Sequence, residues 1–412
     1  MAPRYVPYFN IILGGFVHFT LVGGILLMLP FASASGKLTS PVTAFFTAIS
    51  AVSATGLVVV DTRDYWSPWG QVVILALIQI GGLGFMTLTA FLLLMLRHRV
   101  NVQDELVTET AGVGGQRHFL LFAWGVLAVT VIIEAVGASL MFLRLRELSV
   151  PNPIWQSAFH SIAAFNNAGF DLQGGLVSLV GFQRETYLLG VLAGLIILGG
   201  LGVPLLLEIV TRRPWFRWSL DAKLSITSVL WLVALGSAAI FVAELLGQVS
   251  VEGLSPGGKA MNAFFLSASA RTAGFANLEI GRLTLQTLLV LMVLMFIGGA
   301  AGSTAGGVKV NTFATIVLTA ISYLRGHRRV HVFRHVIPES QVHRAISVVF
   351  LGVAMVFVVT MLLTITDRQQ PFVSLLFETV SALTTTGFTT GITPDLSTGG
   401  QVLLMLAMFV GR

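Results

Sequence analysis

The sequence predicts an all-α polytopic membrane protein in which four pseudo-symmetric units surround one central pore. Three observations predict this fold class. Of the 412 residues, 55% are hydrophobic and only 10% are charged, and the mean hydropathy is +0.88. Apolar runs of about 20 residues, the length that a spanning helix needs, recur along the chain. Between them, one short pattern that ends in a glycine occurs four times.

The repeated pattern is a short amphipathic stretch that ends in small or hydroxyl residues, followed by a glycine and a bulky apolar residue. Its copies are 44–57, 157–170, 262–275 and 375–388. The glycines are Gly56, Gly169, Gly274 and Gly387, separated by 113, 105 and 113 residues (169−56, 274−169, 387−274). A single copy would be typical of a glycine that ends a helix. Four copies at near-equal spacing, each between spanning runs, instead indicate a pore.

Each copy lies between two long apolar runs, which predicts eight spanning helices in all. The paired runs are 10–30 with 70–96, 119–143 with 186–210, 224–247 with 284–323, and 343–366 with 399–412. The intervening runs near 41–54, 153–166, 258–271 and 371–384 are too short to cross a bilayer, so we expect re-entrant pore helices. Prolines suited to a helix start stand at or beside three of them, at Pro41, Pro153 and Pro371. The predicted units are 1–97, 98–212, 213–330 and 331–412.

The two ends of the chain carry one prediction each. The first apolar run follows Arg4 without a convincing cleavage site, so it is expected to be a spanning helix and not a signal peptide. The last run begins near Gly399 and reaches Arg412 after 14 residues, short of the ~20 that a span requires. We therefore expect the fourth unit to be truncated.

Basic residues favour one side of the predicted membrane protein. The loops 97–118, 211–223 and 325–344, together with Arg4, carry 13 Lys and Arg, against nine on the opposite side. Cytoplasmic loops are the ones enriched in Lys and Arg. This predicts a cytoplasmic N-terminus, with the four glycine loops facing outward. The net charge of +6 is attributed to this topology, and nucleic-acid binding is not expected.

The glycine loops are predicted to form an ion filter. A dehydrated cation needs oxygen ligands in place of its water shell, and rings of backbone carbonyls can supply them. Turning consecutive carbonyls to one side requires backbone conformations of alternating hand, which glycine adopts at low cost. The partially negative C-terminal end of each pore helix also favours a cation. The candidate filter residues are Ala54, Thr55, Gly56, Asn167, Ala168, Gly169, Thr272, Ala273, Gly274, Thr385, Thr386 and Gly387.

A glycine-rich stretch interrupts the second spanning run of the third unit. Residues 296–311 contain five glycines, and each costs a helix about 1 kcal/mol against alanine, so a break in the helix is expected. A helix-packing face is the alternative, because Gly298 and Gly302 have the GxxxG spacing. A phosphate loop is excluded because the Walker spacing fails at Lys309. A lysine at membrane depth is also hard to place on a lipid-facing helix.

These segments resemble the membrane subunit of the Trk/Ktr/HKT potassium transporters over essentially the whole chain. The most specific stretches are 165–170 (FNNAGF), 271–275 (RTAGF), 298–309 (GGAAGSTAGGVK) and 384–388 (TTTGF). Because the chain starts directly at the first spanning helix, it is most similar to the Ktr-type (KtrB-like) subunit. Plant relatives of one subclass place serine where this chain has Gly56. All four glycines together favour potassium over sodium.

The resemblance implies potassium uptake across the bacterial inner membrane through a gated, channel-like pore, with Na⁺ as an activator. The alternatives are a symporter that couples K⁺ to H⁺ or Na⁺, and a non-transporting scaffold or enzyme. The resemblance also implies a homodimer and a cytoplasmic RCK-type (KtrA-like) ring of nucleotide-binding subunits. No catalytic arrangement, organic cofactor or transition-metal site is expected. The implied gate residues are Gly298, Gly299, Gly302, Ser303, Thr304, Gly306, Gly307, Lys309 and Arg412, the last of them facing the pore and contacting the third-unit loop.

Charged residues at membrane depth need partners, because a buried charge is costly when it is unpaired. Arg271 and Glu378 lie on adjacent pore helices and are predicted to pair behind the filter, with direct ion coordination as the alternative. Asp61 and Asp64 are expected either to concentrate cations at the mouth or to lie in a solvated loop. Glu134, Glu208 and Glu244 are predicted to be helix-packing or interfacial carboxylates, with a proton relay as the alternative. His327, His331, His335 and His343 form a weak metal-site candidate.

Overall fold

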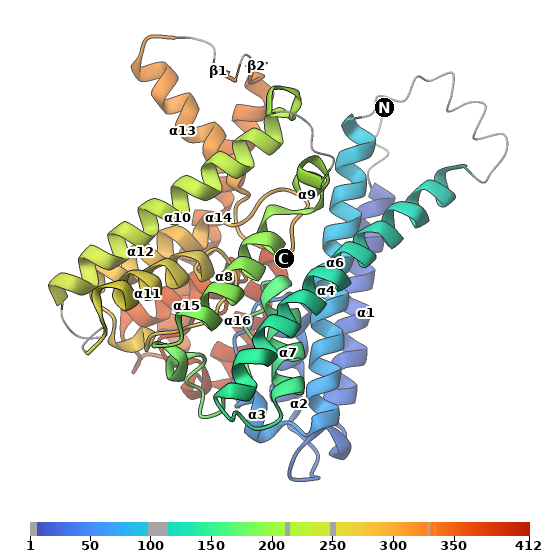
Figure 1. The fold of residues 1–412 in the computed structure, drawn as a ribbon, viewed down its shortest axis with the longest axis vertical. Coiled ribbons are helices and arrows are strands. Elements are labelled where there is room, and N and C mark those ends of the chain that lie inside the picture. Colours follow the sequence, from blue (N-terminus) through green and yellow to red (C-terminus); the bar gives the residue numbers. More distant parts are fainter. Residues whose placement is uncertain (1–5, 98–113, 211–214, 248–252, 328–329, 334) are drawn as a thin grey trace.

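The computed structural model describes residues 6–97, 114–210, 215–247, 253–327, 330–333 and 335–412. In the described part the regular secondary structure is helical, apart from a two-stranded hairpin of β1 (His331–Val332) and β2 (His335–Val336). Figure 1 shows the hairpin at one end of the long axis, at about the height of the end of α13. The predicted unit boundary at 98 and the basic residues Arg4, Arg99 and Arg213 lie outside the described residues.

One order recurs four times along the chain: a long first helix, a short pore helix and a second spanning segment. The first unit holds α1 (Val6–Met28), η1 (Pro30–Ala32), α2 (Pro41–Val52), α3 (Thr62–Tyr65) and α4 (Pro68–Arg97). The second holds α6 (Gly114–Glu147), α7 (Pro153–Phe165), η2 (Val180–Phe182), α8 (Thr186–Leu201) and α9 (Val203–Val210). The third holds η3 (Trp215–Arg217), α10 (Leu220–Gly247), α11 (Pro256–Ser269), η4 (Ile280–Arg282), α12 (Leu285–Phe296) and α13 (Val310–Leu324). The fourth holds α14 (Glu339–Thr366), α15 (Phe372–Leu383), η5 (Thr393–Asp395) and α16 (Thr398–Gly411).

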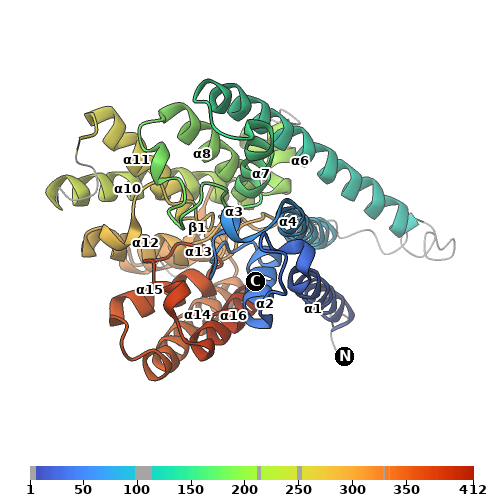
Figure 2. The ribbon, with the colours of Figure 1, turned by 90° about the horizontal axis from the view of Figure 1, so that it is seen from below.

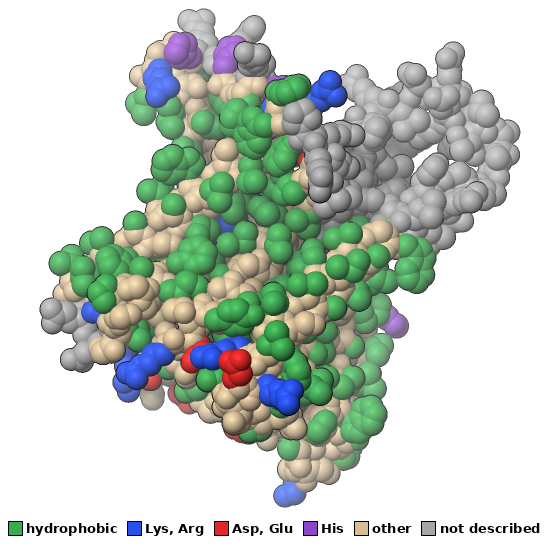
Figure 3. All heavy atoms as spheres, viewed as in Figure 1, with side chains coloured by type: hydrophobic (Ala, Val, Ile, Leu, Met, Phe, Trp, Pro, Cys, Tyr) green, Lys and Arg blue, Asp and Glu red, His purple; other side chains and the backbone are tan. Residues whose placement is uncertain are grey.

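The outer helices have the surface of a membrane protein. Within the described ranges, three helices are long and apolar enough to cross a bilayer on length and composition alone: Ala123–Glu147, Leu220–Gly247 and Glu339–Thr366. Large hydrophobic side chains on them are exposed, including Trp231 at 66% and Phe350 at 74%. Figure 3 shows hydrophobic side chains spread over the visible face between the two ends. Such an extensive apolar surface indicates that it faces lipid.

The four predicted pore helices are confirmed as α2, α7, α11 and α15. The side chains of Ser40 and Ser255 cap two of them by accepting the Thr43 and Gly258 amides. The third helix was expected to begin near 258 but starts at Pro256, so all four begin at or directly after a proline. Proline is favoured at this position because its missing N–H would have had no partner in the first turn.

The helices pack in a closed cycle around a central axis. In each unit the first long helix packs on its own pore helix, as α1 does on α2 and α6 on α7. The second spanning segment packs on the pore helix of the next unit, in the pairs α4·α7, α8·α11, α12·α15 and α16·α2. Figure 2 shows the four groups arranged around the axis. The last pair closes the ring, because it joins the fourth unit to the first.

Two of the eight predicted spanning segments are interrupted. The break in the third unit was expected, and the helix ends at Phe296 and resumes at Val310. The run 186–210 was expected to be continuous, and this prediction was wrong, because it divides into α8 and α9 at Gly202. Gly202 has φ +80, outside the helical region, and Pro204 in a continuous helix would remove a backbone hydrogen bond and clash with the Gly200 carbonyl.

Candidate functional site

After each pore helix, the backbone alternates in hand over three residues that we call a filter segment. The segments are 54–56, 167–169, 272–274 and 385–387. Their first residues, Ala54, Asn167, Thr272 and Thr385, have φ values of 52, 52, 71 and 50°. The glycines that end them, Gly56, Gly169, Gly274 and Gly387, have φ values of 88, 67, 77 and 95°. Positive φ is uncommon outside glycine, so its recurrence at one position in four units indicates a shared constraint.

The four filter segments form a closed ring. A Cβ atom added to any of the four glycines would collide with the backbone of the next segment. A Cβ on Gly56 would meet the Ala168 carbonyl oxygen, and a Cβ on Gly169 would meet that of Ala273. A Cβ on Gly274 would meet the Thr386 carbonyl oxygen, and a Cβ on Gly387 would meet that of Thr55. Each carbonyl therefore lies at the junction of two segments, and no side chain fits there.

Hydroxyl groups hold the first and fourth filter segments. The Gly56 amide donates to the Ser50 hydroxyl at 3.0 Å, and Gly387 and Ser381 form the same bond at 3.0 Å. The second and third segments lack this bond, because Ala163 and Ala268 occupy the serine position. The ring is therefore fourfold in backbone shape but not in its supporting side chains.

Longer polar side chains support the second and third segments. Three residues before the glycine, Asn166 donates to Glu134 Oε1 at 3.0 Å and to Gln79 Oε1 at 2.8 Å. At the same position in the third unit, Arg271 donates to the Gly298 carbonyl at 3.4 Å. All of these contacts connect a filter segment to helices or loops outside its own pore helix.

The predicted pair between Arg271 and Glu378 is wrong. Glu378 instead accepts hydrogen bonds from Thr389 and Thr393 at 2.7 Å and from the Thr390 amide at 2.8 Å, on the loop that follows the filter. Arg271 stands three residues before its glycine and Glu378 stands nine before its own. This offset is almost two helical turns, or roughly 9 Å along a helix, so the two side chains lie at different depths.

His160 has the same role in the second unit as Glu378 has in the fourth. It too stands nine residues before the filter glycine, and its Nε2 accepts the Leu172 amide at 3.2 Å. The Leu172 and Thr390 amides both lie three residues after the glycine. Buried polar side chains at this depth therefore fix the outer loops of two units.

The interrupted helix of the third unit places a loop, residues 297–309, beneath the filter. Ala300, Ser303, Thr304 and Ala305 are fully or almost fully buried. The Thr304 hydroxyl donates to the Phe165 carbonyl and accepts from Asn167 Nδ2, each at 3.1 Å. These bonds join the loop to the second filter segment.

The same loop contacts the other units as well. Its Gly306 amide donates to the Thr272 hydroxyl at 3.1 Å, directly below the third segment. Arg412 donates to the Thr304 carbonyl at 2.6 Å and to the Gly81 carbonyl at 3.2 Å, which joins the loop to the fourth and first units. The predicted contact between Arg412 and the loop is therefore present. Lys309 donates to the Ala305 carbonyl within the loop at 2.6 Å.

Sequence reasoning missed Gly202, which lies beside this loop, and Gln79, which lies behind the second filter segment. A Cβ on Gly202 would lie 2.8 Å from the Gly302 carbonyl, so the unpredicted break in the second unit makes room for the loop. The signal was the sequence Gly-x-Pro at Gly202–Pro204, which is typical of a helix end. Gln79 was also missed, although it is the one amide side chain in the uncharged run 72–96.

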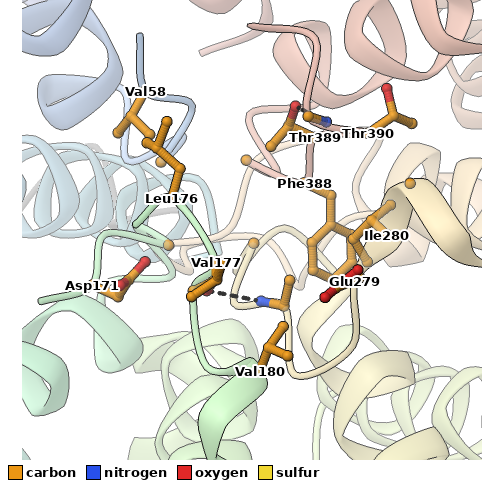
Figure 4. Close-up of a pocket in the computed structure, with 18 of the residues that line it drawn as sticks. Val58, Asp171, Leu176, Val177, Val180, Glu279, Ile280, Phe388, Thr389 and Thr390 are labelled. Carbon is orange, nitrogen blue, oxygen red and sulfur yellow. Dashed lines mark hydrogen bonds between the residues drawn. The ribbon is translucent and has the colours of Figure 1, made fainter. Parts of the chain in front are cut away.

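A cavity of about 330 Å³ opens above the ring of filter segments. All four filter glycines line it, together with Asp61, Asp171, Glu279 and Arg282. Figure 4 shows Val58, Leu176, Val177, Ile280 and Phe388 around this mouth. Of the two predicted mouth carboxylates, Asp61 lines the cavity and accepts the Leu176 amide at 2.8 Å, whereas Asp64 is not among its lining residues.

Asp171 adds a titratable charge to the mouth. Burial raises the pKa of its carboxyl from 3.8 to about 6, and the nearby negative charge of Asp61 adds to the shift. The carboxylate is therefore present above this pKa and is lost as the pH falls through it.

We expect cation entry at low cation concentration to fall about twofold when the outer pH drops from well above to well below this pKa. Protonation removes the attraction between the Asp171 carboxylate and a cation in the mouth, which at ~8 Å in water is worth about 0.5 kcal/mol. Flux measured against outer pH checks this. The flux through Asp171→Asn should stay at the low-pH value at every outer pH. The flux through Asp64→Asn should depend on outer pH as it does in the unchanged protein. Unaltered pH dependence in Asp171→Asn would contradict the assignment.

The remaining candidates have simpler surroundings. Glu208 accepts from Ser219 and Glu244 accepts from Thr287, both near helix ends, as expected of packing carboxylates. In the described ranges, no group of three or more His, Cys, Asp or Glu side chains is placed to hold a metal ion.

Comparison with known proteins agrees with this architecture. Residues 8–412 match the family model TrkH, described as a cation transport protein. The chain is 37% identical to "Ktr system potassium uptake protein B" of Bacillus subtilis, covering 97% of this chain and 89% of that protein. It is 33% identical to "Potassium/sodium uptake protein NtpJ" of Enterococcus hirae, covering 98% of this chain and 90% of that protein.

The fold has a solved counterpart. The crystal structure of the potassium transporter TrkH from Vibrio parahaemolyticus aligns with a TM-score of 0.76 at 22% identity, over 97% of this chain and 82% of that one. At this level of identity the likeness concerns the fold. The family match over nearly the whole length decides the classification: the chain belongs to the TrkH family of cation transport proteins.

Proposed function

We propose that this protein takes up potassium through the ring of filter segments. The observation that supports this most is the alternating backbone hand at the same three positions of all four segments. This conformation turns successive carbonyls toward one side, where they can replace the water shell of a cation. The junctional carbonyls of Thr55, Ala168, Ala273 and Thr386, and those of the residues before them, are the proposed K⁺ ligands. Relatives named as potassium uptake proteins support the choice of ion.

The proposed unit boundaries, 1–97, 98–212, 213–330 and 331–412, give each unit one filter segment. We further propose that the loop 297–309, with Arg412, is the gate. It fills the space under the filter and contacts all four units, so cations cannot pass while it stays in place. Lys309 and Arg412 add positive charge on this path, which opposes cation passage further.

In the proposed cellular setting, the protein is a multi-pass protein of the bacterial inner membrane with a cytoplasmic N-terminus. It forms a homodimer in which each protomer has its own pore. A cytoplasmic ring of nucleotide-binding regulatory subunits controls the gate, in keeping with a relative named as one component of a Ktr system. Sodium acts as a stimulating ion, as the name of the Enterococcus hirae relative suggests.

A channel-like mechanism is favoured over symport because the twelve filter residues include no ionisable side chain that could couple a proton. The driving force is then the membrane potential, worth about 2.3 kcal/mol per charge per 100 mV, or roughly fiftyfold accumulation. Vesicles that contain the full-length protein should stop accumulating Rb⁺ when the potential is collapsed and a proton gradient is kept. Continued accumulation would favour symport with H⁺, and dependence on a sodium gradient would favour symport with Na⁺.

A cation series tests the substrate itself. Uptake of K⁺ and Rb⁺ should greatly exceed that of Na⁺ and Li⁺, because two rings of four carbonyls each fix one size of site. If vesicles that contain the full-length protein and its regulatory partner show no cation flux, the transport function is refuted.

A further inference from the structure

A carboxylate from an outer helix lies directly behind the second filter segment. Glu134, near the middle of α6, is only 6% exposed. Its two oxygens accept from Gln79 Nε2 at 3.1 Å each, and Oε1 also accepts from Asn166 Nδ2 at 3.0 Å. Asn166 immediately precedes the filter segment 167–169. One hydrogen bond therefore separates this carboxylate from the filter backbone.

The second filter segment lacks the support that the first and fourth have. Ala163 replaces the serine that would accept the glycine amide, and Ala168 replaces the threonine before the glycine. In the first unit that threonine, Thr55, bonds to Ser53 at 2.6 Å, and the fourth unit has the matching bond between Thr384 and Thr386 at 2.8 Å. The second segment has neither bond, so its side-chain support on the outer-helix side comes through Asn166.

The network around Asn166 joins three helices from two units. Asn166 donates to Gln79 Oε1 on α4 and to the Ile162 carbonyl on its own pore helix, at 2.8 and 2.9 Å. The Ser161 hydroxyl donates to the Glu134 carbonyl at 2.7 Å, which fixes α6 against the same pore helix. No basic side chain bonds to Glu134 in the described part of the chain. A carboxylate placed in the membrane without one is costly, and such groups commonly have a function.

We propose that Glu134 is a positioning residue for the filter: it holds the second filter segment through Asn166 and thereby contributes to the discrimination among cations. The proposal rests on the proposed ion filter. Glu134 does not touch the ion. It fixes the orientation of the Asn166 amide, which in turn fixes the start of the segment whose carbonyls face the pore.

The test compares two substitutions of Glu134 by the ratio of Rb⁺ to Na⁺ uptake in cells that lack other potassium uptake systems. Glu134→Ala leaves two buried amides without their acceptor, and we expect the ratio to fall about tenfold. Glu134→Gln keeps the oxygen that accepts from Asn166 and from Gln79 and loses only the second of the two contacts with Gln79, so most of the ratio should be retained. Asn166→Ala removes the intermediate and should resemble Glu134→Ala. The double variant Glu134→Ala/Asn166→Ala should lose no more than either single variant, because the two residues act in series.

A matched control comes from the corresponding helix of the third unit. Glu244 on α10 is also buried, at 2% exposed, and accepts from Thr284 and Thr287, neither of which is a filter residue. Glu244→Ala should lower the amount of folded protein without changing the ion ratio. An unchanged ratio in Glu134→Ala and Asn166→Ala would overturn the proposal. So would an equal fall in Glu134→Gln or in Glu244→Ala. If the unchanged protein takes up no Rb⁺, the proposed function itself has failed.

Discussion

Replacing Gly56 by serine is expected to lower the preference for Rb⁺ over Na⁺ by roughly tenfold to a hundredfold, because forced strain at such a backbone position costs about 1–3 kcal/mol. Gly56 has φ +88, and its added Cβ would collide with the Ala168 carbonyl and lie 2.8 Å from the Cα of Gly169. One of the two segments must move, and the carbonyls at their junction move with it. Uptake of Rb⁺ and Na⁺, normalised to the amount of protein in the membrane, measures the change.

Gly36 provides the matched control for this substitution. It has a similar φ of +68, but no atom lies within 4 Å of an added Cβ. Gly36→Ser therefore carries the backbone strain without the collision, and it should retain the ion preference. If Gly56→Ser keeps the preference of the unchanged protein, the assignment of residues 54–56 to the filter is wrong.

Removing the loop beneath the filter, residues 298–307, is expected to raise flux roughly tenfold or more. Several hydrogen bonds to the other units, worth about 0.5–1.5 kcal/mol each, hold the loop in its blocking position, and the deletion removes both the bonds and the obstruction. The deletion is feasible because Ile297 and Val308 already lie side by side in a β-bridge, with the Gly298 amide 2.9 Å from the Val308 carbonyl. Flux should also lose most of its dependence on the regulatory partner and its nucleotide.

The ion preference is the internal control for the deletion. The Gly56 and Gly387 amides bond to serines of their own pore helices, so the first and fourth filter segments do not depend on the loop. The second and third segments lose the bonds of Asn167 to Thr304 and of Gly306 to Thr272, so the Rb⁺ to Na⁺ ratio should fall by about tenfold, the worth of two such bonds, and a preference for Rb⁺ should remain. A deletion protein that reaches the membrane and conducts only when the partner is activated would show that the gate lies elsewhere.

The sequence was most informative where the cause of a structure is local. Proline starts, short apolar length and a following glycine predicted all four pore helices, and only the start of the third had to be moved to Pro256. Five glycines within one apolar run predicted the break between α12 and α13. In each case the conformation is decided by interactions within a few residues of the chain, so it can be predicted from the local sequence.

Contacts between units were mostly not predictable from the residues alone, and the contact of Arg412 with the third-unit loop was expected only from the family resemblance. Arg271 and Glu378 were predicted to pair because their pore helices are neighbours, but the pair requires equal depth, and depth depends on how far along its helix each residue stands. The break at Gly202 makes room for a loop that is about a hundred residues away in sequence, and the local Gly-x-Pro signal does not show which segment will occupy that room.

The sequence by itself determined the four repeats, the membrane setting, the pore helices and the glycines of the filter segments. Hydropathy decides whether a segment leaves water for the membrane, and proline and glycine decide the local backbone conformation. Only the tertiary structure decided what holds each filter segment in place. Gln79 and Asn166 meet Glu134 because three helices of two units pack at particular rotations and depths. Those rotations are set by the packing of the whole ring, since a buried polar side chain must find its partner wherever the neighbouring helices bring one.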